Sequence, residues 1–143
     1  MTRPGNIQYY EDVDRCIAST GVQGVMTAEG NLYNPAIFDL SYKDKPPNCW
    51  EMCTEYLDLV DRYPCPLSYS RGHVFKMLHH LLQMPENFDV REIVAKAKSK
   101  QAFREAVAII KSRYIIDLNT SIYEPRENTD FDTVCLYGRG MPS

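Results

Sequence analysis

Apolar residues recur at helical spacing from Cys49 onward, and prolines divide this part of the chain into separate segments. The first segment repeats its apolar residues every three or four positions, at Trp50, Cys53, Leu57 and Val60. It runs through Tyr63, where Pro64 and Pro66 interrupt the pattern, because proline removes a main-chain donor and clashes with a continuing helix. The pattern therefore predicts one amphipathic helix up to Tyr63.

Three more helices are predicted after these prolines. The second runs over 68–84 and ends at Pro85. The third and fourth cover 90–98 and 101–118, with Ser99 as a suitable N-cap for the last one. Together these segments predict a four-helix cluster, so the chain is expected to be mostly α.

The upstream part of the chain has a different pattern. Residues 11–19 predict a short helix, which Gly21 ends. Residues 22–27 then form a short apolar run that favours a strand. This order is typical of half of a βα repeat.

A glycine-containing turn at 28–31 follows the predicted strand. Asn34 and Pro35 next suggest a helix start, as cap and first helical residue. Residues 41–48 predict a linker, because the Pro-Pro pair within them stops any regular element.

Composition limits the function classes. The chain has 143 residues, 44% of them hydrophobic and 24% charged, which is typical of an ordinary globular domain. Its net charge is −3 and its pI about 5.6, unlike the strongly basic balance of a small nucleic-acid module. Any RNA contact would therefore need a local basic face.

Several features bear on the cellular compartment. No apolar run approaches the roughly 20 residues that cross a bilayer, and residues 1–6 lack the apolar core of a signal peptide. The five cysteines are odd in number and mostly lie in apolar stretches, which favours reduced, buried thiols. We expect an intracellular protein, located in the cytoplasm, with the nucleus as an additional location. Residues 119–143 are polar and are expected to be disordered.

The turn at Ala28, Glu29 and Gly30 could hold an anion. Main-chain N–H groups of such a turn can point at phosphate oxygens, and a helix N-terminus adds positive dipole. The Glu29 carboxylate would have to face away from a phosphate. A plain strand-to-helix turn is the alternative interpretation, and spacing alone favours it.

The helix predicted over 68–84 has two faces. Its apolar face carries Val74, Leu78, Leu81 and Leu82, and its opposite face carries His73, Lys76, His79 and His80. The basic face fits RNA binding and fits a solvated surface equally well. Arg71 falls on the apolar face, so it should pair with an acidic residue of 51–61, extend past the edge of that face to solvent, or project into a functional site.

Two other kinds of site find little support. Cys49 and Cys53 are four residues apart, but no CxxC pair or HExxH spacing is present, so no metal is expected. Ser68 and Ser70 lie near His73 without a GxSxG elbow, so a serine nucleophile is not expected either.

Three strings in the right order resemble a known family. They are 5–17, 21–38 and 50–80, with Gly-Val-Met-Thr-Ala-Glu-Gly-Asn-Leu-Tyr-Asn-Pro and Leu-Ser-Tyr-Ser-Arg-Gly-His-Val-Phe-Lys as their most specific parts. They resemble the C-terminal part of the eukaryotic tRNA-dihydrouridine synthases that act at positions 16 and 17 of the D-loop. The resemblance covers roughly residues 5–104.

The resemblance implies an FMN enzyme that reduces uridine in tRNA with NAD(P)H. Its fold would be a TIM (β/α)₈ barrel followed by a helical bundle that grips tRNA. Gly5 and Asn6 match the end of the strand 7 motif, and Ala28 and Glu29 match the turn after strand 8, where the FMN phosphate is held. The residues that match the tRNA-facing motif are Arg71, His73 and Lys76.

The sequence also departs from the family pattern. Pro4 stands where the family has an asparagine. The resemblance implies that the first six strands and the catalytic cysteine lie outside this chain. No catalytic residue is therefore assigned to this chain, which is expected to be inactive alone. Residues 1–40 are expected to be a partial barrel end of low stability, because a strand without partners leaves its edges unpaired.

The resulting organisation is a barrel remnant (1–40), a linker (41–48), a helical tRNA-binding domain (49–118) and a tail (119–143), as a monomer. Two alternatives stay open. The bundle could be a non-enzymatic tRNA-binding or interaction module. The turn alone would also allow another FMN barrel enzyme, such as a relative of dihydroorotate dehydrogenase, but the helix from Leu67 argues against it.

Overall fold

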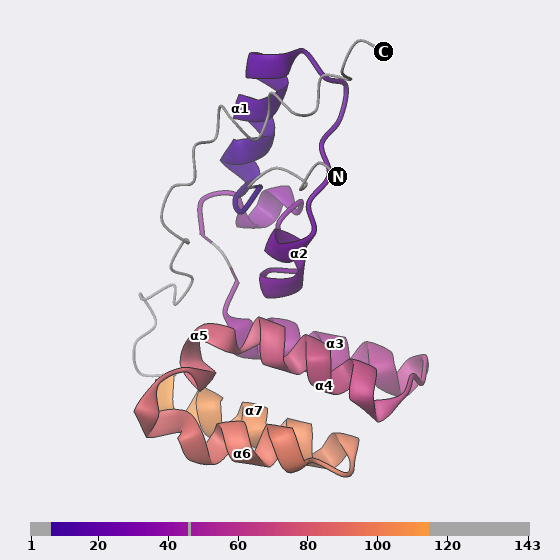
Figure 1. Ribbon diagram of the computed structural model, residues 1–143, viewed down its shortest axis with the longest axis vertical. Helices are drawn as coiled ribbons and strands as arrows, with labels where there is room; N and C mark the ends of the chain where they lie inside the picture. Colours follow the sequence, from indigo (N-terminus) through magenta and orange to yellow (C-terminus); the bar gives the residue numbers. More distant parts are fainter. Residues whose placement is uncertain (1–6, 46, 115–143) are drawn as a thin grey trace, which may run out of the picture.

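The computed structural model describes residues 7–45 and 47–114, and helices are the only regular elements within these ranges (Figure 1). The mostly α character predicted from the sequence is therefore confirmed. A small N-terminal unit, residues 7–45, stands on a bundle formed by the helices from Cys49 to Tyr114.

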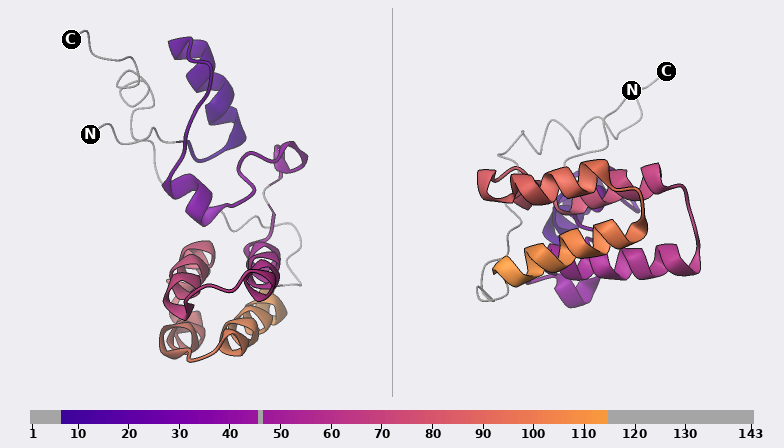
Figure 2. Two further views of the ribbon diagram at one scale, coloured as in Figure 1. Left: turned by 90° about the vertical axis from the view of Figure 1, so that its right-hand side faces the viewer. Right: turned by 90° about the horizontal axis from the view of Figure 1, so that it is seen from below.

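The bundle has two layers of helices, seen end-on in the left view of Figure 2. One layer holds α3 (Cys49–Arg62) and α4 (Leu67–Met77), and the other holds α6 (Phe88–Lys96) and α7 (Lys100–Tyr114). Short α5 (His79–Leu82) and the 3₁₀ turn η2 (Pro85–Asn87) connect the layers. The predicted four-helix cluster is thus present.

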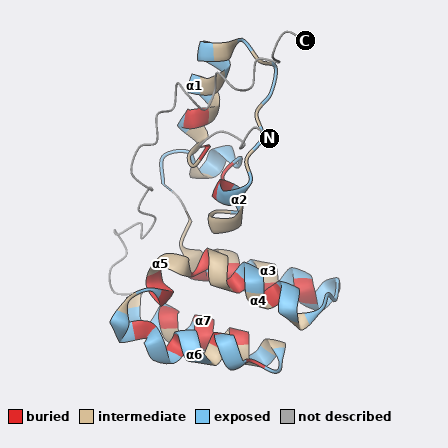
Figure 3. Ribbon diagram, viewed as in Figure 1, coloured by how far each residue is buried: buried red, intermediate tan, exposed pale blue. Residues whose placement is uncertain are grey.

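The core of the bundle is built from the apolar stripes of all its helices. The buried side chains include every apolar residue that the sequence placed on the inner faces of α3 and α4–α5: Trp50, Cys53, Leu57, Val60, Val74, Leu78, Leu81 and Leu82. Val90, Phe103 and Ile110 complete the core from the second layer. Burying each large side chain stabilises the fold by about 1.5–3 kcal/mol. Figure 3 shows these buried residues concentrated in the bundle.

The helix predicted over 68–84 is interrupted at Leu78. The α4 helix ends at Met77, and Leu78 has φ −94° and ψ 9°, outside the α-helical region. Its N–H still bonds to the Val74 carbonyl at 3.0 Å, so the chain bends without losing this bond. The side chain of Leu78 is fully buried, and the bend turns α5 toward η2 and the second layer (Figure 1).

Helix α1 (Tyr10–Thr20) agrees with the predicted helix at 11–19. Its start is held by Asp12, whose carboxylate accepts from the N–H groups of Gln8 and Tyr9 at 2.9 and 3.0 Å. Its end is Gly21, at φ 70°, whose N–H bonds to the Ile17 carbonyl. A left-handed conformation at this position favours glycine, which explains the stop signal.

The predicted strand at 22–27 is absent from the structure, because a strand needs a neighbour to pair its main-chain groups and the described residues provide none. The predicted glycine turn is instead the start of α2 (Glu29–Tyr33). Asn34 ends this helix rather than starting one, since its N–H bonds to the Gly30 carbonyl at 2.9 Å. The barrel remnant therefore stays a prediction.

Gly30 is the closest-packed point of the N-terminal unit. A Cβ atom at this position would lie 2.2 Å from the Ile7 carbonyl oxygen and 2.8 Å from the Thr27 hydroxyl. Thr27 itself donates to the Ile7 carbonyl at 2.9 Å. Only glycine allows this approach, which gathers Ile7 and Ile37 into a small buried cluster beside α2. A turn (35–38) and η1 (Leu40–Tyr42) then lead to the bundle.

Candidate RNA-binding surface and phosphate turn

Part of the predicted basic face contacts the N-terminal unit. Lys76 on α4 has its ammonium nitrogen 5.0 Å from the centroid of the Tyr33 ring and 3.4 Å from the Tyr33 hydroxyl. The rings of His79 and His80 lie 5.3 and 6.1 Å from the same tyrosine ring. These groups therefore hold α2 against α4, and Lys76 is half-buried.

His73 lies one turn before Lys76 on α4 and is exposed. Its ring centroid is 5.2 Å from that of Tyr56 on α3, with the two planes tilted by 48°. This contact orients the imidazole at the surface without burying it. His73 and Lys76 thus lie on one face of α4, as the periodicity predicted.

Arg71 is directed toward α6, away from that face. Its guanidinium donates to the carbonyl oxygens of Val94 and Ala97, at 3.3 and 2.5 Å. The Ala97 carbonyl lies just beyond α6, and the Val94 carbonyl in its last turn also accepts from the Ala97 N–H at 3.4 Å. The arginine therefore adds a charged donor at the end of the helix and complements the negative end of its dipole. Arg71 is therefore a helix cap in this structure, and its guanidinium does not share the surface of His73 and Lys76.

Two acidic residues of the segment 51–61, Asp58 and Asp61, have partners other than Arg71. Asp61 on α3 accepts from Lys100 and Arg104 of α7, and Asp58 accepts from Arg104 at 2.8 Å. The hydrogen bonds from Lys100 and Arg104 lower the pKa of Asp61. The ion pair expected between Arg71 and the segment 51–61 is therefore replaced by pairs between α3 and α7.

Ala28 and Glu29, the predicted phosphate residues, are exposed at the start of α2. The first N–H groups of any helix lack partners within it, so this start can donate to an anion. The described residues do not enclose the turn, so they provide no wall for a flavin ring. Gly5 and Asn6 lie outside the described residues.

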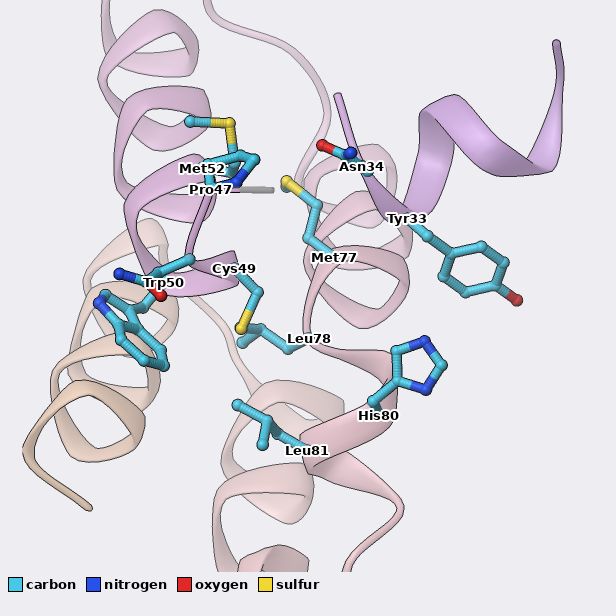
Figure 4. Close-up of a pocket in the computed structure, with 11 residues that line it drawn as sticks. Tyr33, Asn34, Pro47, Cys49, Trp50, Met52, Met77, Leu78, His80 and Leu81 are labelled. Atoms are coloured by element: carbon cyan, nitrogen blue, oxygen red, sulfur yellow. The ribbon is translucent and has the colours of Figure 1, made fainter. Parts of the chain in front are cut away.

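A cavity that the sequence did not indicate lies between the end of α2 and the bundle (Figure 4). Tyr33 lines it from α2, Trp50 from α3, Met77 from α4 and Leu81 from α5. Cys49 also lines it, and burial raises the pKa of this thiol to about 12. The thiol therefore stays protonated near neutral pH and is a packing residue rather than a nucleophile.

The structure also places the residues considered for other chemistry. Ser70 is fully buried, and its hydroxyl contacts the Cys65 sulfur at 3.2 Å. Within 7–45 and 47–114, no three side chains of His, Cys, Asp or Glu gather as a metal site. None of the described helices has the length and apolar character needed to span a membrane.

Sequence comparison adds a family and several relatives. The family described as dihydrouridine synthase (Dus) matches residues 2–115. A Mus musculus protein named tRNA-dihydrouridine(16/17) synthase (NAD(P)(+))-like is 48% identical over 115 residues, which are 80% of this chain and 23% of that protein. The tRNA-dihydrouridine(16/17) synthase of Schizosaccharomyces pombe is 35% identical over 122 residues, 78% of this chain and 30% of that protein.

The corresponding Saccharomyces cerevisiae enzyme is 36% identical over 110 residues, 71% of this chain and 25% of that protein. The chain thus spans about a quarter of the length of the curated relatives it matches. No solved structure matches the chain.

Proposed function

The chain belongs to the dihydrouridine synthase family, and we propose that it serves as the C-terminal part of an enzyme that reduces uridine to 5,6-dihydrouridine in the D-loop of tRNA. The observation that carries this proposal is the family match over residues 2–115, together with 48% identity to a relative named for this reaction. A cytoplasmic location, with the nucleus as an additional one, is part of the proposal.

The proposed cofactors are FMN and NAD(P)H. FMN, when bound, supplies the hydride for uracil reduction and is itself reduced by the nicotinamide. The residues of this chain proposed for its phosphate end are Ala28 and Glu29, with Gly5 and Asn6. Main-chain N–H groups at the α2 start would bind the phosphate, and the Glu29 side chain would have to face away, because a carboxylate repels a phosphate dianion. The flavin ring would lie against the rest of the enzyme.

The proposed role of the bundle is to bind tRNA through His73 and Lys76, which lie on one face of α4. Arg71 supports this role by holding α4 to the end of α6, where its guanidinium bonds to Val94 and Ala97. A second candidate function is a non-enzymatic tRNA-binding module. The continuous core of α3–α7 favours it, because such a core can keep the bundle folded without a barrel.

Activity decides between these two functions. We expect no dihydrouridine when the purified chain is mixed with FMN, NADPH and unmodified tRNA, because the chain has no assigned catalytic residue. The sharper experiment is a chimera in which this chain replaces the matching segment of the mouse relative. The chimera should form dihydrouridine, detected by mass spectrometry of digested tRNA. A chimera that folds and binds tRNA but forms no dihydrouridine would favour the binding module.

Binding itself can be measured by fluorescence anisotropy with labelled tRNA. Replacing His73 and Lys76 together by alanine should weaken binding and reduce the slope of log K against log salt by about 1, because one phosphate contact of Lys76 is lost. Lys111→Ala is the matched control, since Lys111 is an exposed lysine on α7. Absence of any binding at low salt would reject both functions for the bundle.

A further inference from the structure

Two tyrosines at one end of the bundle are largely exposed. Tyr63 is 69% exposed and Tyr69 is 65% exposed. They flank the loop between α3 and α4, residues 64–66. Because aromatic side chains normally bury most of their surface, two such rings beside one short loop indicate a contact surface.

The loop that carries these tyrosines is held in place from several sides. Two of its three residues are prolines, which restrict the backbone. The third, Cys65, contacts the buried Ser70 hydroxyl at 3.2 Å, and the N–H of Tyr69 bonds to the Pro66 carbonyl at 3.0 Å. A preorganised loop loses little conformational entropy on binding, which favours recognition by rigid aromatic rings.

The same end of the bundle is basic. The loops α3–α4 and α6–α7 lie side by side there (Figures 1 and 2), and Arg71 joins them through the carbonyls of Val94 and Ala97. We call residues 58–71 and 92–104 the basic tip. It contains six cations and three carboxylates, although the whole chain has a net charge of −3. The cations are Arg62, Arg71, Lys96, Lys98, Lys100 and Arg104, and the carboxylates are Asp58, Asp61 and Glu92.

All three carboxylates of the basic tip form ion pairs. Asp58 and Asp61 pair with Arg104 and Lys100, and Glu92 pairs with Lys96. Arg62 and Lys98 are exposed and have no ion-pair partner within the described part of the chain. These two side chains are therefore available for external phosphates, with their nearest acids already neutralised.

The basic tip is continuous with the candidate RNA-binding face. Tyr69, His73 and Lys76 follow one another at positions i, i+4 and i+7 of α4, so they form one stripe along the helix. The stripe begins beside Tyr33 and ends at the loop with Tyr63. A strand of RNA held by Lys76 and His73 would therefore reach both tyrosines.

We propose that the basic tip binds an unpaired stretch of RNA, with bases stacked on Tyr63 and Tyr69 and phosphates contacted by Arg62 and Lys98. Every base has a π-face, and exposed rings interleaved with cations are the arrangement by which proteins hold single strands. A protein partner is less favoured, because the basic tip has twice as many cations as carboxylates, a balance that suits a phosphate backbone. This proposal rests on the tRNA-binding function proposed for the bundle.

The test is binding of fluorescein-labelled unmodified tRNA to the full chain and to ring variants. Changing Tyr63 and Tyr69 together to leucine should raise the dissociation constant roughly tenfold or more, because base stacking is lost. Changing both to phenylalanine should leave it within about twofold. Phe88→Leu is the matched control, because Phe88 is also exposed (51%) but lies at the opposite end of α6. All these side chains are exposed, and circular dichroism checks that the variants fold.

Two further measurements make the test specific. A single-stranded oligouridine should compete for the basic tip better than duplex RNA of equal length. Arg62→Ala with Lys98→Ala should lower the salt slope by about 0.7 for each lost contact with a single strand.

The outcomes separate this proposal from the broader one. If the wild-type chain does not bind tRNA, the tRNA-binding function of the bundle fails and the tip proposal fails with it. If the leucine variant binds tRNA as well as wild type while the His73 and Lys76 variant does not, only the tip proposal is overturned. If the leucine variant changes self-association by sedimentation and leaves tRNA binding intact, the tip is a protein interface instead.

Discussion

Lys76 on α4 places its ammonium nitrogen 5.0 Å from the centroid of the Tyr33 ring on α2, although 43 positions separate the two residues. A cation over an aromatic face is attracted by the quadrupole of the ring. This pair, with His79 and His80 beside it, joins the N-terminal unit to the bundle. It also means that a residue predicted to bind RNA has a structural partner.

Removing the ring of Tyr33 should loosen the N-terminal unit from the bundle. Tyr33→Ala loses the contact with Lys76, worth about 0.5–1 kcal/mol at a partly exposed site. Amide hydrogen exchange should become faster in residues 28–38 and stay unchanged in α6 and α7. Tyr33→Phe keeps the ring face and should behave like wild type. If residues 28–38 exchange as slowly in Tyr33→Ala as in the wild-type chain, the contact between Tyr33 and Lys76 does not hold α2.

Replacing Arg71 should destabilise the bundle. Arg71→Ala leaves the carbonyls of Val94 and Ala97 without their charged donor, which costs about 1.5–3 kcal/mol. Urea unfolding measures this loss. Arg62→Ala is the control, because Arg62 is an exposed arginine whose loss should change stability little. If Arg71→Ala lowers tRNA affinity but not stability, the arginine contacts RNA rather than capping α6.

Gly30 should tolerate no side chain. In Gly30→Ala the new Cβ would lie 2.2 Å from the Ile7 carbonyl oxygen, so the N-terminal unit must shift, at a cost of about 1–3 kcal/mol. The matched control is Gly24→Ala, where no atom lies within 4 Å. Limited proteolysis should cut residues 7–45 of the Gly30 variant faster than those of the control. Similar cutting of both variants would contradict the packing seen at Gly30.

Acid should weaken the contact between α3 and α7. The pKa of Asp61 is lowered by its hydrogen bonds from Lys100 and Arg104, so the folded state binds a proton at Asp61 less readily than the unfolded state does. Its contribution to stability is present above the unfolded pKa of about 3.9 and is lost as pH falls through the lower folded pKa. Tm measured from pH 6 down to pH 3 should fall less steeply in Asp61→Asn than in Asp44→Asn, where Asp44 has no ion-pair partner among the described residues.

The cysteines should differ in reactivity. Burial raises the pKa of Cys49 to about 12 and that of Cys53 further, whereas Cys65 is exposed. At pH 8 the Cys49 thiol is therefore almost entirely protonated. Iodoacetamide should therefore label Cys65 in the folded chain, and peptide mass spectrometry should find Cys49 and Cys53 labelled only in urea. Rapid labelling of Cys53 without urea would contradict its burial.

Local signals in the sequence were sufficient to predict most of the helices. The stop at Gly21, the apolar stripe through Trp50 and Leu57, and the break at Pro85 each depend on residues a few positions apart. Such short-range steric and amphipathic constraints act in any compact fold of this chain. The inner faces of the bundle helices could therefore be predicted from the sequence.

The incorrect predictions all concern segments whose conformation depends on residues distant in the sequence. Residues 22–27 have strand-like apolar character, but a strand forms only beside another strand. Asparagine can cap either end of a helix. Because Gly30 packs against Ile7, Asn34 lies at the end of α2. The bend at Leu78 allows α5 to reach the second layer of the bundle, which no local signal indicated.

The sequence by itself determined the family, the apolar faces of the bundle helices, and the stripe of polar residues on α4. Only the tertiary structure decided what those polar residues touch: Arg71 caps α6, Lys76 holds Tyr33, and the acids of α3 pair with α7. The reason is physical. Helix formation and amphipathicity depend on neighbours within one or two turns, whereas a charged side chain reaches several ångströms from its helix and takes the partner that packing places there.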